Sequence, residues 1–356
     1  MGKQTYLKPI DASGIRRILV RITNWIGDTV MVLPALEAVK LNFPDSEITA
    51  LVKPWVAPLF EHHPAVDRVL LFEKAERFPA DLISLLKTAG KIRSMGFDLA
   101  VLFQNAFEAA LLSRLGGVPL RVGYDTDGRG LLLTHPVSRK RTAPQGHQVE
   151  YYLAMLRAIG WEAPLKDPRL HVAPGSETSA LRLFSLEEIE QEGFFLGIAP
   201  GAAFGPAKRW PPERFAALAD QAVEQWGARV LIFGSATDRD LGREVKASMK
   251  NRAWNLCGET SLGEAVALIK RCRLFLTNDS GLMHVAAALE VPTVAIFGST
   301  DPAATGPRGP HTRVVKKPTD CAPCLKAVCP KDFRCMLAIH PGDVWKVMEE
   351  LRGEFQ

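Results

Sequence analysis

Short runs of β-branched and aliphatic residues alternate with helical patterns along most of this chain, and this alternation strongly constrains its fold. The runs that predict strands are residues 17–22, 47–52, 68–72, 98–103 and 120–123 in the first half, and 194–199, 229–233, 254–256, 274–277 and 293–297 in the second. Short apolar runs separated by helices are typical of parallel strands covered by helices on both faces. The pattern predicts two doubly wound α/β domains.

The segment 166–185 interrupts the alternation, because it carries the turn-forming pairs Asp167-Pro168 and Pro174-Gly175. We therefore expect an N-terminal domain over 1–172, a linker over 173–190 and a C-terminal domain over 191–340. A last helix, over 341–356, can pack back on the N-terminal domain. Two such domains that face one another would leave a cleft at the carboxyl ends of both sheets, where ligands bind in folds of this kind.

The charge and hydropathy of the chain indicate its partners and its compartment. The net charge of +5 favours an anionic partner, such as a phosphorylated ligand, an acidic membrane surface or a nucleic acid, although a mildly basic soluble protein would carry it too. No basic stripe interleaved with aromatic residues is visible, so we expect no nucleic acid. No apolar run approaches the ~20 residues of a membrane span, and the N-terminus lacks the apolar core of a signal peptide. We expect a cytoplasmic protein.

The first loop that could carry functional residues follows the strand predicted at 17–22. It contains Gly27 and Asp28 but no G-x-G-x-x-G, so the dinucleotide fingerprint is absent. Asp28 stands where a helix cap belongs, and capping is one interpretation. The other is a carboxylate at the carboxyl end of a strand that accepts a proton from a hydroxyl group.

Two loops in the second half have the composition of anion sites. Small residues from Gly201 onward lead to Lys208, and they would let backbone amides approach an anion beside that cation, although a solvated surface loop is the alternative. The other loop, Asp279-Ser280-Gly281, starts a helix whose amides and Ser280 hydroxyl could bind an anion, with His284 on the same helix face. Here the alternative is that Asp279 only caps the helix.

Three motifs together resemble the ADP-heptose:lipopolysaccharide heptosyltransferases, glycosyltransferase family nine. They are Gly27-Asp28 with Leu33-Pro34-Ala35-Leu36, the loop from Pro200-Gly201 to Lys208-Arg209-Trp210-Pro211, and Thr277-Asn-Asp-Ser-Gly-Leu-Met-His284. The resemblance runs from Ile18 to about Leu351. The form Phe204-Gly-Pro-Ala-Lys-Arg-Trp and the late Cys-x-x-Cys are more similar to the branch that adds the second core heptose than to the branch that adds the first.

The resemblance implies a GT-B fold, with the acceptor in the N-terminal domain and ADP-heptose in the C-terminal domain. It implies an inverting transfer from ADP-L-glycero-D-manno-heptose onto the first heptose of the lipopolysaccharide inner core, without a metal or another cofactor. Asp28 matches the general base and Lys208 the lysine at the diphosphate. The residues matched to nucleotide-sugar binding are Gly201, Lys208, Thr260, Leu262, Asp279, Ser280, Gly281 and His284.

The acceptor would be lipid-anchored, so the enzyme is expected at the inner face of the cytoplasmic membrane as a peripheral protein. Its contacts are expected in loops 104–108 and 125–129, where Arg121 and Arg129 could meet acceptor anions or lie on a solvated surface. A paralogue with another nucleotide sugar or acceptor, and a nucleotide-binding protein without transfer chemistry, remain as alternatives.

Four thiols lie close together near the C-terminus: Cys321, Cys324, Cys329 and Cys335. A cytosolic setting argues against stable disulfides. Four thiolates could hold zinc, but their spacing is not that of the common zinc modules. Reduced packing thiols and a metal site are both open, and our expectation is no metal. Cys257 and Cys272 lie in apolar surroundings that predict a core position.

Overall fold

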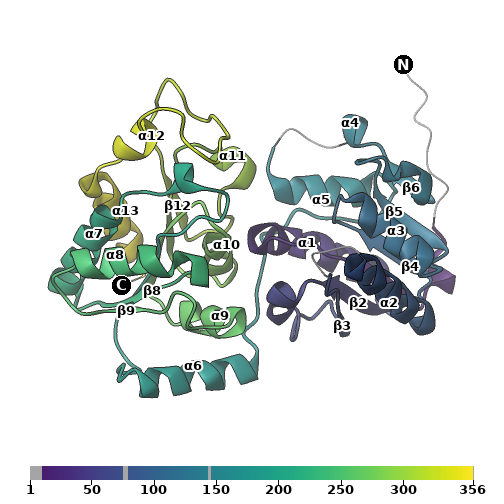
Figure 1. Ribbon diagram of the computed structural model, residues 1–356, viewed down its shortest axis with the longest axis horizontal. Helices are drawn as coiled ribbons and strands as arrows, with labels where there is room; N and C mark the ends of the chain where they lie inside the picture. The colour runs from purple at the N-terminus through teal and green to yellow at the C-terminus, as the bar shows by residue number, and fades with distance from the viewer. Residues whose placement is uncertain (1–9, 75–78, 143–145, 356) are drawn as a thin grey trace. The chain divides into compact units, whose positions relative to one another are not determined.

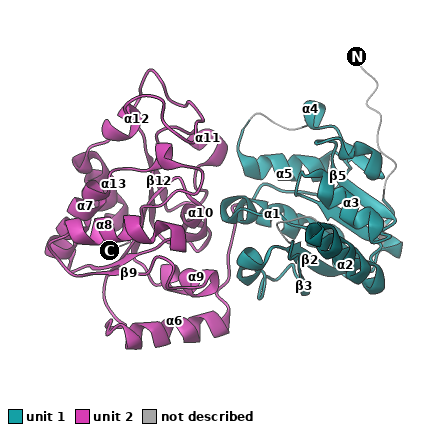
Figure 2. Cartoon of the chain, viewed as in Figure 1, with its two compact units in different colours: residues 1–166 teal, residues 167–356 magenta. Residues whose placement is uncertain are grey.

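The computed structural model describes residues 10–74, 79–142 and 146–355. The chain forms two compact units, Met1–Lys166 and Asp167–Gln356, each with its own parallel sheet (Figure 2). The division follows Lys166, rather than residue 172 as the turn-forming pairs suggested. No helix in these described stretches is long and apolar enough to cross a membrane.

The first unit has a six-stranded parallel sheet in the order β3-β2-β1-β4-β5-β6 (Figure 1). Its strands are β1 (Arg17–Arg21), β2 (Glu47–Val52), β3 (Arg68–Leu71), β4 (Leu99–Leu102), β5 (Leu120–Tyr124) and β6 (His135–Val137). The first five were predicted within two residues of their ends. The sixth was not, because it is three residues long and carries Pro136, which is tolerated only at a sheet edge.

Helices cover this sheet in packed pairs. They are α1 (Ile26–Asn42), α2 (Ala80–Met95), α3 (Phe107–Leu115), α4 (Arg139–Thr142) and α5 (Gln148–Arg157). Helix α1 packs against α5, and α2 against α3. Alternate strand residues such as Leu19 and Leu102 form a buried cluster with Ile92 of α2 and Leu112 of α3, as expected for a strand period of two.

The second unit repeats the architecture, with strand order β12-β11-β10-β7-β8-β9. Its strands are β7 (Phe195–Ala199), β8 (Arg229–Ile232), β9 (Ala253–Asn255), β10 (Leu274–Asn278), β11 (Thr293–Ile296) and β12 (Thr312–Val315). Its helices are α6 (Pro174–Leu186), α7 (Pro212–Trp226), α8 (Arg239–Ser248), α9 (Leu262–Lys270), α10 (Gly281–Ala288), α11 (Pro302–Thr305), α12 (Arg334–Leu337) and α13 (Pro341–Gly353). Strand β12 is half-exposed and was not predicted.

Two segments differ from the expected domain plan. Helix α6 occupies most of the predicted linker, because Pro174 begins the helix at its first turn and the helix packs on α9. Helix α13 packs on α7 and β12 of the second unit, and Trp345 stacks on Trp226 with ring centroids 4.4 Å apart. Both helices therefore contribute to the core of the second unit.

The strand orders show where a ligand can bind in each unit. In both sheets the order reverses between the first and the fourth strand, β1 and β4 in one unit and β7 and β10 in the other. All strand pairs are parallel, so the carboxyl ends lie at one edge of each sheet. Doubly wound folds bind ligands at that edge, at the point of reversal.

Candidate functional site

Two loops of the second unit meet at the reversal point of its sheet. Lys208, from the loop after β7, donates to Asp279, the residue after β10, with 2.5 Å between Lys208 Nζ and Asp279 Oδ2. The side chains are 13% and 5% exposed. The Thr300 hydroxyl donates to the same oxygen at 2.6 Å. An ammonium group is thus held in a fixed place where the fold predicts an anion.

Asn278, the last residue of β10, fastens the Lys208 loop to the sheet. Its side-chain amide donates to the carbonyl of Pro200 at 2.6 Å, and its side-chain oxygen accepts from the Trp210 backbone N–H at 3.1 Å. Trp210 is fully buried, and its indole N–H donates to the carbonyl of Ile339. The loop between Pro200 and Trp210 is therefore fixed at both ends. No role was predicted for Asn278 from the sequence, although it lies in the motif from Thr277 to His284. An asparagine there gives no sign in the sequence that it binds a distant loop.

Ser280, not Asp279, caps helix α10. Its backbone is extended and its side-chain oxygen accepts from the N–H of Met283 at 3.4 Å. The interpretation of Asp279 as a simple cap is therefore wrong, because its carboxylate is taken by Lys208 and Thr300. The Ser280 hydroxyl also lies 3.1 Å from the hydroxyl of Thr277. The Lys208 ammonium contacts Asp279, and α10 begins two residues after Asp279.

The other predicted nucleotide-sugar residues lie on elements of the same unit. Gly201 approaches Asp238 so closely that a Cβ would stand 2.5 Å from its carboxyl group, which explains the need for glycine there. Thr260 and Leu262 are half-buried at the start of α9, after β9. His284 is buried within α10. Because all strands are parallel, the loops after β7, β9 and β10 lie at one edge of the sheet.

The Cys-rich segment, residues 320–335, borders the Lys208 loop. The Ala207 N–H donates to the carbonyl of Ala327 at 3.0 Å, and a Cβ at Gly205 would collide with that carbonyl. The Leu325 N–H donates to the carbonyl of Ser299, next to Thr300. The segment therefore contacts the Lys208 loop and the loop that carries Thr300, the hydroxyl partner of Asp279. The sequence gives no signal of either contact.

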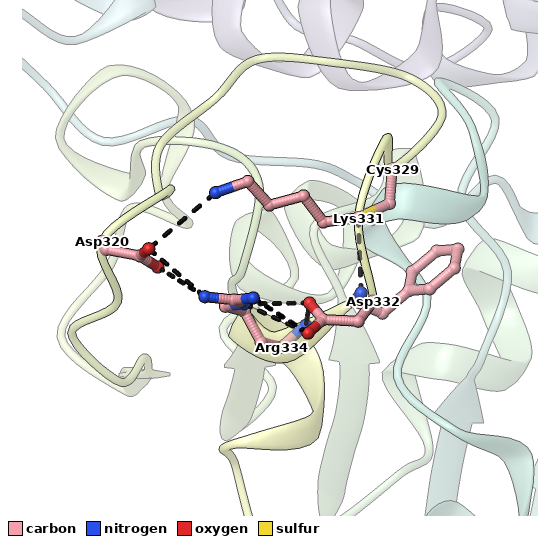
Figure 3. Close-up of polar contacts among 6 residues, drawn as sticks. Asp320, Cys329, Lys331, Asp332 and Arg334 are labelled. Atoms are coloured by element: carbon pink, nitrogen blue, oxygen red, sulfur yellow. Dashed lines mark hydrogen bonds and ion pairs between the residues drawn. The ribbon is translucent and has the colours of Figure 1, made fainter.

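Charged side chains near the two ends of the Cys-rich segment contact one another (Figure 3). Arg334 donates to Asp332 at 2.9 Å and to Asp320 at 3.3 Å, and Lys331 also pairs with Asp320. These contacts join the two ends of the segment. The Phe333 N–H donates to the Cys329 sulfur at 3.3 Å.

All six cysteines are free thiols. Burial raises the pKa of Cys335, and the charges of Cys321, Cys329 and Cys324 raise it further. In the described parts of the chain, no group of three or more His, Cys, Asp or Glu side chains is arranged to hold a metal.

In the first unit, Asp28 lies in the first turn of α1, which begins directly after β1. The cap position belongs to Trp25, whose side chain makes no capping hydrogen bond. The interpretation of Asp28 as the N-cap residue is therefore wrong, because it stands three residues inside the helix. Its carboxylate is half-buried and close to α5: burial raises the pKa of Tyr152, and the Asp28 charge raises it further. Asp28 therefore stands at the carboxyl edge of the sheet, where the fold predicts a ligand.

The two loops expected to contact an acceptor do meet. A cavity of about 360 Å³ at the same edge is lined by Asn105 and Ala106 after β4, Thr126 and Asp127 after β5, and Arg139, Gln148 and Tyr151. The Asn105 side chain donates to the Tyr151 hydroxyl at 2.8 Å. Most of the residues that line the cavity have polar side chains.

Arg121 and Arg129 are neither acceptor contacts nor surface groups. Arg129 is fully buried and donates to the carbonyls of Tyr124 and Gln104, and to the Asn105 side chain. Arg121 donates to the carbonyls of Val118 and Leu132. Both hold loops together, because a guanidinium group can satisfy several carbonyl oxygens at once. The expectation for these two residues was wrong.

Two doubly wound units, one with a cation and a helix N-terminus at its reversal point and the other with a carboxylate, have the architecture of the GT-B glycosyltransferases. The model of glycosyltransferase family 9 (heptosyltransferase) matches residues 85–333. The chain belongs to this family.

Relatives and solved structures agree with this membership. The chain is 35% identical to lipopolysaccharide heptosyltransferase 2 of Escherichia coli K12, over 95% of this chain and 98% of the relative. The structure of E. coli ADP-heptose LPS heptosyltransferase II matches with a TM-score of 0.81 and 30% identity, covering 95% of this chain and 99% of the other. A family 9 glycosyltransferase from Veillonella parvula matches with a TM-score of 0.84 and 25% identity, covering 95% and 97%.

Proposed function

We propose that this protein transfers heptose from ADP-L-glycero-D-manno-heptose onto the first heptose of the lipopolysaccharide inner core, with inversion at the anomeric carbon. The names of the relatives, among them lipopolysaccharide heptosyltransferase 2 of E. coli and Salmonella typhimurium, support heptose transfer to lipopolysaccharide. The matched E. coli structure, an ADP-heptose LPS heptosyltransferase, supports ADP-heptose as the donor. The observation that carries the proposal is the Lys208–Asp279 pair beside the Ser280 cap, at the reversal point of the second sheet.

In this proposal the donor diphosphate binds Lys208 and the first amides of α10. An ammonium has three N–H donors, and Asp279 takes one, so two remain for phosphate oxygens. The buried Asp279 carboxylate holds the ammonium in place and acts on the substrate through Lys208. Gly201, Ser280, Gly281 and His284 line the diphosphate and sugar, and Thr260 and Leu262 line the adenosine.

The reaction forms a bond between the acceptor oxygen and the anomeric carbon while the bond from that carbon to the diphosphate breaks. The sugar becomes oxocarbenium-like, and negative charge develops on the departing ADP. Lys208 and the α10 amides are placed in advance for that charge. The proton of the acceptor hydroxyl passes to the Asp28 carboxylate, which acts as general base.

We propose that this charge compensation needs no divalent cation. One fixed ammonium and a helix N-terminus can together stabilise the diphosphate of the leaving group. Activity should therefore survive exhaustive treatment with EDTA. A loss that Mg²⁺ restores would show that the compensation is supplied by a metal.

We also propose a peripheral position at the cytoplasmic membrane. The lipid-anchored acceptor requires access to that surface, and the net charge of +5 favours attraction to acidic lipids. Binding to vesicles that contain anionic lipid should weaken as salt rises, because mobile ions screen the attraction.

The direct test is product analysis with a panel of nucleotide sugars and a defined mono-heptosylated core acceptor. The proposal predicts transfer from ADP-heptose, release of ADP, and an inverted anomeric configuration in the product. Transfer from another nucleotide sugar instead would favour the paralogue. Binding of ADP-heptose without transfer to any core acceptor would favour a nucleotide-binding protein without transfer chemistry.

A further inference from the structure

Two cations of the first unit have no role in the reaction described above. Arg21 is the last residue of β1, and Lys53 follows the last residue of β2 directly. They are 2% and 8% exposed. Burial of a charge is costly unless a group of opposite charge or several hydrogen bonds compensate it. Two neighbouring buried cations therefore need an explanation.

The register of the sheet brings these side chains together. Arg21 lies opposite Leu51 on the neighbouring strand, and Lys53 stands two residues further along, on the same face. Both cations contact the ring of Phe72: Lys53 Nζ lies 4.3 Å and Arg21 Cζ 5.4 Å from its centroid. Burial lowers the pKa of Lys53, and the nearby charge of Arg21 lowers it further.

Among the described residues, no acid forms an ion pair with Arg21 or Lys53. Arg21 donates to the carbonyls of Ile22 and Leu51 and to the side-chain oxygen of Asn24, all neutral acceptors. No hydrogen bond or ion pair of Lys53 is found among the described residues, and its Nζ is not among the atoms sealed from solvent. Glu108 is the described acid whose charge favours both cations, but its carboxylate pairs with Lys74.

The place of this cluster relates it to the proposed acceptor. Arg21 binds Asn24 in the loop that leads from β1 into α1, and the Trp55 indole N–H donates to the Asn24 carbonyl at 2.8 Å. The same loop ends at the helix turn that carries Asp28. The cations and the proposed base therefore stand at the same edge of one sheet, on either side of one short loop.

From these contacts we infer that Lys53, supported by the charge of Arg21, binds a carboxylate or phosphate oxyanion of the acceptor. The inference rests on the proposed function, because it takes the acceptor to be the anionic substrate of the first unit. An oxyanion at Lys53 Nζ would supply hydrogen bonds and an opposite charge that no described residue supplies. Charge-assisted bonds of this kind are among the stronger polar contacts. Lys53 would anchor the acceptor while the reacting hydroxyl group of the acceptor contacts Asp28.

The test is acceptor binding by calorimetry in the presence of ADP, with wild type, Lys53→Met and Lys53→Arg. Removing one charge-assisted contact should weaken acceptor binding about 10- to 100-fold. Lys53→Arg should keep most of the affinity because it keeps the charge. Lys91→Met, which removes an exposed cation from α2 of the same unit, is the matched control and should bind as wild type does. The affinity for ADP should be the same in all four proteins.

Two chemically altered acceptors identify the anion. If the group is a carboxylate, the methyl ester of the acceptor should bind wild type and Lys53→Met equally, and dephosphorylation should leave the difference intact. If the group is a phosphate, the dephosphorylated acceptor should bind wild type and Lys53→Met equally, and methyl esterification should leave the difference intact. If the Lys53→Met defect persists with both altered acceptors, the inference is overturned.

The remaining outcomes separate this inference from the proposed function. Equal binding of the native acceptor by wild type and Lys53→Met would refute the inference alone. No acceptor binding by wild type would refute the proposed function, and the inference with it. Thermal unfolding of Lys53→Met and Lys53→Gln should keep the wild-type midpoint, since no protein hydrogen bond is lost. A large fall in both variants would mean that the ammonium is structural, which overturns the inference.

Discussion

Replacing Lys208 by Met should reveal both the structural and the chemical role of the Lys208–Asp279 pair. The substitution keeps a long side chain but removes the ammonium from a contact of 2.5 Å. It leaves the Asp279 carboxylate, which is 5% exposed, with the Thr300 hydroxyl as its partner in the contacts described above. An uncompensated buried carboxylate is the expected source of instability.

The size of the expected loss of stability follows from the burial of the Lys208–Asp279 pair. Breaking a buried ion pair by removing one partner typically costs about 3–5 kcal/mol, because the remaining charge stays desolvated. The Thr300 hydrogen bond keeps part of the compensation, so we expect a loss near the lower end, about 3 kcal/mol of unfolding free energy. Replacing Asp279 by Asn in the same protein removes the stranded charge. The double variant should regain most of the lost stability but none of the activity.

Two assays separate these effects. Urea unfolding of wild type, both single variants and the double variant gives the coupling free energy of the pair. Titration with ADP gives the affinity for the diphosphate, which should fall by at least about tenfold in Lys208→Met and in the double variant. Turnover should fall further than the affinity, since the charge on the leaving diphosphate grows in the transition state.

Two results would refute this reasoning. If the double variant were as unstable as Lys208→Met, the instability would not come from the stranded carboxylate. If Lys208→Met bound ADP as wild type does, Lys208 would not contact the diphosphate, and the donor site would lie elsewhere.

Three further predictions concern other parts of the chain. Asp28→Asn should lower kcat at least about 100-fold with unchanged ADP affinity, because a general base acts in the transition state; a steady-state assay with the core acceptor decides this, and unchanged kcat would remove Asp28 from the chemistry. Arg129→Met should lower the unfolding free energy by at least about 2 kcal/mol, since buried carbonyl oxygens lose their donor; unchanged stability with weaker acceptor binding would return Arg129 to the acceptor site. Burial and the nearby charge of Asp238 raise the pKa of Cys257 to about 12, and burial also raises that of Cys272. Both thiols stay protonated at pH 8, so mass spectrometry should find iodoacetamide on the half-buried Cys324 long before it labels them.

The sheets could be predicted from the sequence because buried parallel strands are continuous apolar runs between helices. The strand at 47–52 has the predicted ends. The two missed strands are edge strands, one with a proline and one half-exposed, so neither has the apolar signature of a buried strand. The predicted linker contains a helix because Pro174 and Gly175, which indicate a turn by composition, also fit the first turn of a helix.

The candidate site was predictable where local sequence positions a residue at a strand end. Lys208 and Ser280 stand in loops, and Asp28 in the first turn of a helix, at places that follow from the strand order. The pairing of Lys208 with Asp279 was not predictable, because it joins residues 71 positions apart. The sequence alone does not show whether an arginine such as Arg129 faces solvent or satisfies buried carbonyl oxygens of distant loops.

The contact between the Cys-rich segment and the Lys208 loop was also not predictable from the sequence. It consists of backbone hydrogen bonds, such as that from the Ala207 N–H to the Ala327 carbonyl. Backbone groups are alike in every residue, so no side chain marks such a contact in advance.

The central claim is heptose transfer onto a core that already carries one heptose. The most direct test offers the protein ADP-heptose with two defined acceptors, the inner core with no heptose and the inner core with one, and compares kcat/KM from product analysis. Our account predicts efficient transfer to the mono-heptosylated core and little to the bare core. Preference for the bare core would contradict it and assign addition of the first heptose, and transfer to neither would contradict the proposed acceptor altogether.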